Sequence, residues 1–81
     1  MRNEFRNDLV VIVKRKKSLS NLNRLVNQLA DGESVPGDKA LRGEWEGFRS
    51  FEVAADWRVI YKIEDNILHL VRAGTHRDLY E

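Results

Sequence analysis

The chain has 81 residues, of which 33% are charged, and its formal net charge is only +1. A chain of this length is expected to form one domain, residues 1–81, with a small core. It contains no cysteine, which excludes disulfide bonds and thiolate metal sites.

The charges are distributed unevenly along the chain. Residues 1–24 carry seven basic and two acidic side chains, whereas the remainder carries seven basic and eleven acidic ones. The basic segment includes the run Lys14, Arg15, Lys16 and Lys17. Such a segment could meet a polyanion such as RNA, or it could be only the solvated face of a helix.

Two helices are predicted in the first part of the chain. "FRNDLVVIVKRK" at residues 5–16 has apolar residues at helical spacing, although its β-branched run is also compatible with a strand. "LSNLNRLVNQLA" at residues 19–30 has a clear apolar stripe, and Gly32 offers a stop. No apolar run approaches a membrane span and the start lacks a signal-peptide pattern. We therefore expect a helical hairpin in a cytoplasmic protein without membrane association.

The second half predicts a small antiparallel sheet. The glycine-rich stretch "ESVPGDKALRGEWEG" at 33–47 is expected to be a loop. Three strands are predicted after it, at 48–53, 57–63 and 67–73, and the short separators "AAD" and "EDN" favour a meander. The predicted class is α+β, with the helical hairpin packed on one face of the sheet and the other face partly open.

The turn at residues 64–66 leaves two registers open. If all three residues form the loop, Arg58 lies opposite Arg72, and a sheet face with Arg58, Lys62 and Arg72 would be an anion site. A two-residue "DN" turn would shift the pairing by one residue, so that Arg72 would no longer share a face with Arg58 and Lys62.

Several kinds of site are excluded or weakly supported. The two histidines, His69 and His76, are seven residues apart with no HExxH motif, so the sequence predicts no metal site. No Walker loop or serine-hydrolase elbow is present. The second half is instead rich in cationic, acid–base and aromatic side chains. These suit RNA cleavage without metal or cofactor, in which a base activates the 2′-hydroxyl, arginine binds the phosphate and an acid protonates the leaving oxygen.

Three ordered motifs carry a family resemblance. They are "L-x-G-x-W-x-G-F-R" from Leu41 to Arg49, "DW-x-x-IYKI" from Asp56 to Ile63, and "R-x-GTH-x-x-L" followed by an aromatic, from Arg72 to Tyr80. With the helical hairpin, the sequence resembles the YafQ branch of the RelE/ParE toxin superfamily. The resemblance implies a RelE-like microbial RNase fold and a toxin that cuts messenger RNA on the ribosome. It also implies an antitoxin protein as partner.

The resemblance implies roles for individual residues. His76 is expected to be a catalytic acid or base, and Arg72 is expected to hold the scissile phosphate. Asp56 matches the family's functional aspartate, and Tyr80 matches its terminal aromatic that contacts the substrate. The further basic side chains that we expect to contact RNA are Arg49, Arg58, Lys62, Lys14, Arg15, Lys16 and Lys17.

Two positions depart from the family pattern. Lys39 stands where the family has a histidine in its Asp-His-x-Leu loop, and Glu52 stands where it has another before the "DW" turn. Lysine can bind phosphate or donate a proton, and glutamate can act as a base or repel the phosphate. Two alternatives therefore stay open: a ParE-like inhibitor of DNA gyrase, or a weakened toxin that acts mainly as an antitoxin-binding corepressor.

Overall fold

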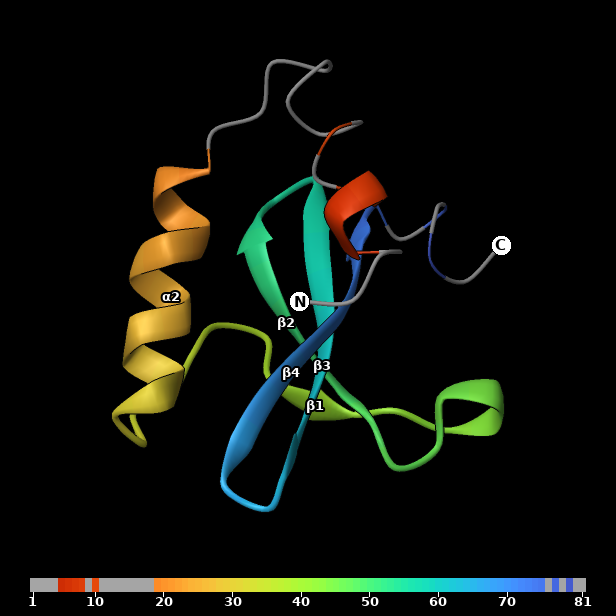
Figure 1. The fold of residues 1–81 in the computed structure, drawn as a ribbon. Coiled ribbons are helices and arrows are strands. Elements are labelled where there is room, and N and C mark those ends of the chain that lie inside the picture. The colour runs from red at the N-terminus through yellow and green to blue at the C-terminus, as the bar shows by residue number, and fades with distance from the viewer. Residues whose placement is uncertain (1–4, 9, 11–18, 76, 78, 80–81) are drawn as a thin grey trace.

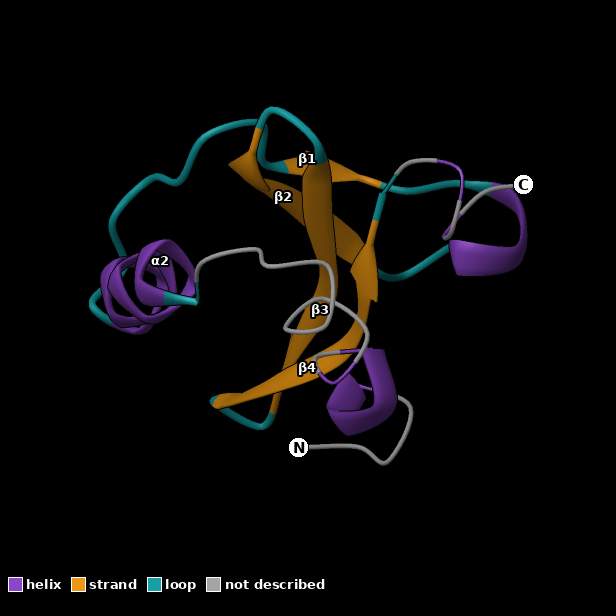
Figure 2. Cartoon of the chain, turned by 90° about the horizontal axis from the view of Figure 1, so that it is seen from above, coloured by secondary structure: helices purple, strands orange, loops and turns teal. Residues whose placement is uncertain are grey.

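The computed structural model describes residues 5–8, 10, 19–75, 77 and 79. Its centre is an antiparallel sheet with the strand order β1-β2-β3-β4 (Figure 1). The strands are β1 (Lys39–Ala40), β2 (Arg49–Ala54), β3 (Trp57–Glu64) and β4 (Ile67–Gly74). Helix α2 (Ser20–Ala30) stands beside the sheet in both ribbon views (Figures 1 and 2). The predicted α+β class with an antiparallel sheet is confirmed.

Helix α2 forms where the apolar stripe predicted it. Leu22 and Leu25 are buried against the sheet, and Gly32 takes φ +80° just after the helix end. Of the first predicted helix, residues 5–8 and 10 are helical, and the rest of 5–16 lies outside the described residues. No helix in the described part of the chain is long and apolar enough to cross a membrane.

The main core lies between α2 and one face of β2 and β3. Alternate residues of the two strands point into it, namely Phe51, Val53, Trp57, Val59 and Tyr61, and each is at most 3% exposed. Each such side chain contributes about 1.5–3 kcal/mol to the free energy of unfolding. Trp57, which is only 2% exposed, is therefore a core anchor, and its ring is not available for stacking on a base.

The β3–β4 turn has two residues. Glu64 pairs with Ile67, and Asp65 and Asn66 have φ of 53° and 62°, as a type I′ turn requires. Aspartate and asparagine tolerate this left-handed conformation better than most residues. The three-residue alternative is therefore wrong, and Arg58 lies opposite Gly74 instead of Arg72.

The two-residue turn alone would place Arg72 on the opposite face of the sheet from Arg58, but a β-bulge in β4 returns it to the same face. Tyr61 pairs with Leu70 but Ile60 pairs with Arg72, so Val71 is the extra residue on β4. Residues opposite each other share a face of the sheet. Arg72 therefore lies on the face of Ile60, which is also the face of Arg58 and Lys62, although the turn is not the one that was expected to put them together.

The stretch 33–47 is not entirely a loop. It contains β1, whose Lys39 pairs with Ser50, and a 3₁₀ turn at Gly43–Trp45. The second face of the sheet carries a smaller apolar cluster in which Ile60, Val71 and Leu79 are buried. Leu41 and Trp45 of the stretch 33–47 pack against this cluster, so this face is partly covered by the expected loop as well as by Leu79 of the C-terminal segment.

Candidate functional site

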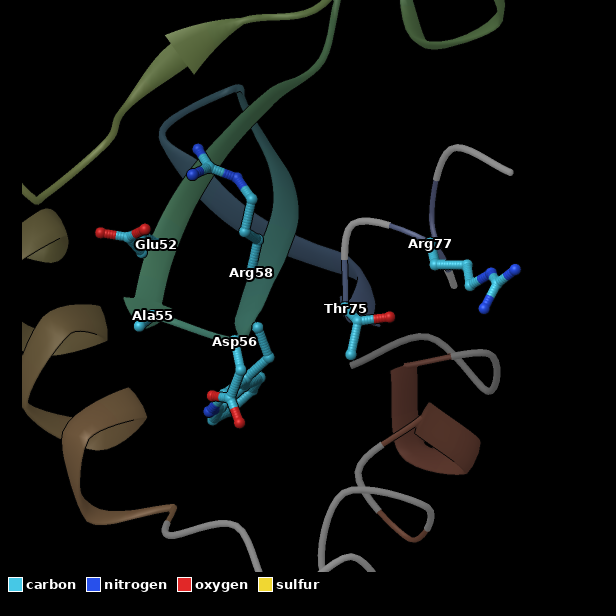
Figure 3. A pocket seen from close by; sticks show the side chains of 7 residues that line it. Glu52, Ala55, Asp56, Arg58, Thr75 and Arg77 are labelled. Atoms are coloured by element: carbon cyan, nitrogen blue, oxygen red, sulfur yellow. The ribbon is translucent and has the colours of Figure 1, made fainter.

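A pocket of about 540 Å³ lies where the β2–β3 hairpin turns beside the segment that follows β4. Figure 3 shows side chains of the hairpin on one side and those of the C-terminal segment on the other. Its lining comprises Glu52, Ala55, Asp56, Trp57, Arg58, Thr75 and Arg77. Two carboxylates and two guanidinium groups thus border one cavity, a composition that suits proton transfer beside a bound phosphate.

Arg58 is the best anchored cation of the pocket. Its Nη2 donates hydrogen bonds to the carbonyl oxygen of Gly37 and, at 3.1 Å, to the hydroxyl of the fully buried Ser50. Its Nε is buried and has no hydrogen-bond partner among the described residues. In the register of β2 and β3, Arg58 lies opposite the half-buried Glu52, so the two charged side chains are neighbours on the same face of the sheet.

The Pro36–Gly37 turn closes over this part of the sheet. The amide of Glu52 donates to the carbonyl oxygen of Pro36 at 2.8 Å, and Gly37 has φ +65°. A Cβ on Gly37 would lie 3.0 Å from Arg58 Nη1 and 3.1 Å from Glu52 Cβ. Glycine is therefore needed at residue 37 both for its backbone conformation and for the space that Arg58 occupies.

Asp56 lies in the exposed turn between β2 and β3 and borders the pocket. A bulge between Glu52 and Ala54 leaves Val53 out of the β2–β3 register. The carbonyl oxygen of Val53 accepts a hydrogen bond of 2.6 Å from Asn21 Nδ2 on α2. This bond ties the helix to the strand three residues before Asp56, and so holds the turn in place.

Arg49 is held away from the face of Arg58. Asp38 Oδ1 accepts hydrogen bonds from Arg49 Nε at 3.1 Å and from the Tyr61 hydroxyl at 2.7 Å. Burial, and then the bond to Asp38, raise the pKa of Tyr61 above its usual 10.0, and the bond to Asp38 raises the pKa of Arg49. Because Arg49 pairs with Tyr61, it lies on the α2 face of the sheet.

Arg72 has an ion-pair partner that the sequence did not indicate. Its Nε and Nη2 lie 2.6 and 3.1 Å from the two carboxylate oxygens of Asp8. Lys62 lies 3.0 Å from the carboxylate of Glu64 and sits over the Phe48 ring, 5.1 Å from its centroid. Lys39 is exposed on β1 opposite Ser50, on the same face as Arg58 and Lys62.

The structure therefore brings together some of the predicted site residues and not others. Glu52, Asp56 and Arg58 line the pocket, and Lys39, Lys62 and Arg72 share the sheet face of Arg58. His76 and Tyr80 lie outside the described residues, as do the four basic residues at 14–17. Thr75 and Arg77, which flank His76 in the sequence, both line the pocket.

The sequence analysis did not single out Thr75 and Arg77 of the pocket lining, nor three residues that support this region, Gly37, Ser50 and Asp8. Gly37 had a signal, because a Pro-Gly pair marks a turn. Ser50 and Asp8 had none, since their roles depend on partners distant in the chain. Within the described part of the chain, no three histidine, cysteine or acidic side chains gather as metal ligands.

Comparison with known proteins gives consistent matches over the whole chain. A family model described as "Bacterial toxin of type II toxin-antitoxin system, YafQ" matches residues 1–81. The mRNA interferase toxin YafQ of Escherichia coli K12 is 33% identical over 81 positions, which span 95% of this chain and 88% of that protein.

Two solved structures are also similar. The crystal structure of YafQ from Escherichia coli BL21(DE3) has a TM-score of 0.90 at 31% identity. The match covers 99% of this chain and 93% of the YafQ chain. The toxin in the Escherichia coli DinJ–YafQ toxin–antitoxin complex has a TM-score of 0.86 at 32% identity, with 99% and 92% covered.

Proposed function

The chain belongs to the YafQ family of bacterial toxins of type II toxin–antitoxin systems, and we propose that it is a ribosome-dependent endoribonuclease that cuts messenger RNA. The observation that carries the proposal is the pocket between the β2–β3 hairpin and Thr75. It brings Glu52, Asp56 and Arg58 together with Thr75 and Arg77, which are the two neighbours of His76 in the sequence. The name mRNA interferase, which the Escherichia coli relative bears, supports the same activity.

The proposed reaction is an attack by the 2′-hydroxyl on its own phosphate, without a metal. A base removes the 2′-proton, and the oxygen attacks phosphorus. The 5′-oxygen then leaves with a proton from an acid. We assign His76 to one proton transfer, with Glu52 or Asp56 as the carboxylate that serves the other or orients the imidazole. Arg72 stabilises the charge that develops on the phosphate oxygens, because a guanidinium donates paired hydrogen bonds to them.

The remaining predicted residues are assigned to RNA binding around this centre. Lys39 binds phosphate or donates a proton in place of the family's histidine. Tyr80 contacts a base at the cut, where an aromatic ring can stack. The face of the sheet with Arg58 and Lys62 supplies positive charge along the path of the bound RNA. Contacts further along the RNA or with the ribosome are assigned to Arg49, Lys14, Arg15, Lys16 and Lys17.

The setting of this activity follows from the family. We propose that residues 1–81 form one toxin domain of the RelE-like microbial RNase fold, with a two-helix hairpin, and that it acts in the cytoplasm. A cognate antitoxin protein would hold it inactive. The DinJ–YafQ complex, in which a related toxin is bound by its antitoxin, supports this partner.

Cleavage of a messenger RNA placed on purified ribosomes tests the proposal. We expect the parent protein to cut the RNA and His76→Ala to cut it at least about 100-fold more slowly, the usual contribution of a positioned acid or base. His69→Ala is the matched control, because it removes the chain's other imidazole from mid-β4, outside the pocket lining. No cleavage by a folded parent protein would contradict the proposed function, and equal rates for all three would remove His76 from the mechanism.

A further inference from the structure

We propose that Asp38 is a positioning residue for cleavage, which sets where the Lys39 ammonium meets the phosphate of the bound RNA. The inference deepens the proposed function and rests on it. Lys39 is the first residue of β1 and lies on the sheet face of Arg58, opposite Ser50. It is exposed, so the place of its flexible stem depends on how the backbone before it is held.

The Asp38 carboxylate is held on the opposite face of the sheet by side chains of β2 and β3. Its Oδ1 accepts a hydrogen bond from the Tyr61 hydroxyl at 2.7 Å and another from Arg49 Nε at 3.1 Å. Tyr61 is 1% exposed and belongs to the main core, so its hydroxyl is a fixed donor. Successive residues of an extended chain point to opposite faces, and a carboxylate fixed on the α2 face therefore directs the next side chain to the other face.

The turn before this carboxylate is tied to the sheet as well. The carbonyl oxygen of Pro36 accepts from the Glu52 amide at 2.8 Å, and that of Gly37 accepts from Arg58 Nη2. The Arg58 bond comes from the face that carries Lys39, whereas the bonds to the carboxylate come from the α2 face. Three consecutive residues are therefore held by β2 and β3, from both faces of the sheet, directly before Lys39.

Strand β1 is a weak anchor for Lys39 by itself. It has only two residues at the edge of the sheet, and both of them are exposed. Lys39 pairs with Ser50, whose hydroxyl accepts from Arg58 of the pocket lining, so a shift of β1 moves the ammonium relative to the pocket. A displacement of about 1 Å can cost on the order of 10²-fold in rate. Loss of the Asp38 anchor should therefore be seen in the rate of cleavage.

Two substitutions at Asp38 separate positioning from simple stabilisation. Asp38→Ala removes the acceptor of both donors, whereas Asp38→Asn keeps an oxygen that can accept at the same place. Asp38→Ala combined with Tyr61→Phe removes the buried donor together with its acceptor, so it serves if the single variant does not fold. Leu29→Ala is the control for stability alone, because Leu29 packs on the core from α2 and takes no part in the bonds that hold residues 36–38.

The experiment measures single-turnover cleavage of ribosome-bound messenger RNA by these variants, with and without Lys39→Ala, and circular dichroism shows that each is folded. We expect Asp38→Ala to lower the maximal rate roughly 10- to 100-fold, the effect of a small misplacement of a catalytic group. Asp38→Asn should recover most of this loss. The ribosome concentration at half-maximal rate should stay unchanged. In the Lys39→Ala background, Asp38→Ala should cause no further loss, because the two residues act as one unit.

Three results would overturn the inference while the proposed function stands. Folded Asp38→Ala that cleaves at the parent rate would show that the carboxylate positions nothing. An equal loss in the presence and absence of the Lys39 ammonium would show that Asp38 acts through the fold, as would an equal loss for Leu29→Ala. Lys39→Ala that cleaves at the parent rate would leave no group to be positioned. A folded parent protein that does not cleave would instead contradict the proposed function, and it is distinguishable because the parent cleaves in the other three cases.

Discussion

Replacing Gly37 by alanine tests how the Pro36–Gly37 turn supports the pocket. At φ +65° any L-residue meets backbone strain of about 1–2 kcal/mol. The new Cβ would also lie 3.0 Å from Arg58 Nη1 and 3.1 Å from Glu52 Cβ. The Glu52 Cβ is fixed in β2, and the guanidinium can withdraw only by leaving its acceptors on Gly37 and Ser50.

The two effects give a magnitude. Hydrogen bonds of a charged group are worth about 1.5–3 kcal/mol, so Gly37→Ala should lower the free energy of unfolding by roughly 3–5 kcal/mol in total. Gly43→Ala is the matched control, because Gly43 has φ +70° but no atom within 4 Å of its ideal Cβ. It should show the backbone cost alone, and the gain from a less flexible unfolded chain is common to both variants.

Urea and thermal denaturation followed by circular dichroism measure the difference. Since 1 kcal/mol shifts the melting temperature of a domain of this size by about 4–8 °C, Gly37→Ala should melt at least about 6 °C below Gly43→Ala. It should also cleave more slowly under conditions in which both are folded, because Arg58 and Glu52 line the pocket. Equal stability of the two variants would refute the packing of Arg58 under Gly37.

Three further predictions concern single side chains. Because folding raises the pKa of Tyr61 above 10.0, the folded state holds the hydroxyl proton more tightly than the unfolded state. The contribution of this group to stability should therefore be intact below pH 10 and be lost as the pH rises through the raised pKa. Urea titrations at pH 7–11 should show the stability of the parent relative to Tyr61→Phe decreasing above pH 10. Asn21→Ala should cost about 1–3 kcal/mol in urea denaturation, because a carbonyl in the bulged part of β2 loses its donor, whereas the exposed Asn23→Ala should change stability by less than about 0.5 kcal/mol; equal losses would contradict the helix–strand bond. Lys39→Ala should leave the melting temperature unchanged but slow cleavage by about 10²-fold or more, and a parent-like rate would remove the lysine from the mechanism.

The sheet was largely predictable because its signals are local. Apolar alternation and the separators "AAD" and "EDN" predicted the three long strands to within a residue or two at each end. Asp65 and Asn66 are residues that favour a type I′ turn, and the structure has one there. Helix α2 was predicted for the same reason, since its apolar stripe and Gly32 lie within one stretch of chain.

The parts that the sequence did not predict depend on contacts between distant residues. The bulge that returns Arg72 to the face of Arg58 has no local marker, because Val71 is as good a strand residue as its neighbours. β1 has only two residues and forms because β2 is there to pair with it. Asp8 and Arg72 are 64 residues apart in the sequence, and the spacing rules for helices and strands predict contacts only between residues a few positions apart.

The chemical ends of the cleaved RNA test the central claim most directly. Attack by the 2′-oxygen expels the 5′-oxygen, so each cut on ribosome-bound messenger RNA should leave a 5′-hydroxyl on the downstream fragment and a cyclic or terminal phosphate on the upstream one. A 2′-deoxy nucleotide at the cut should abolish cleavage there. Fragments with a 5′-phosphate, cleavage at the deoxy position, or intact RNA in the presence of the folded protein would contradict the account.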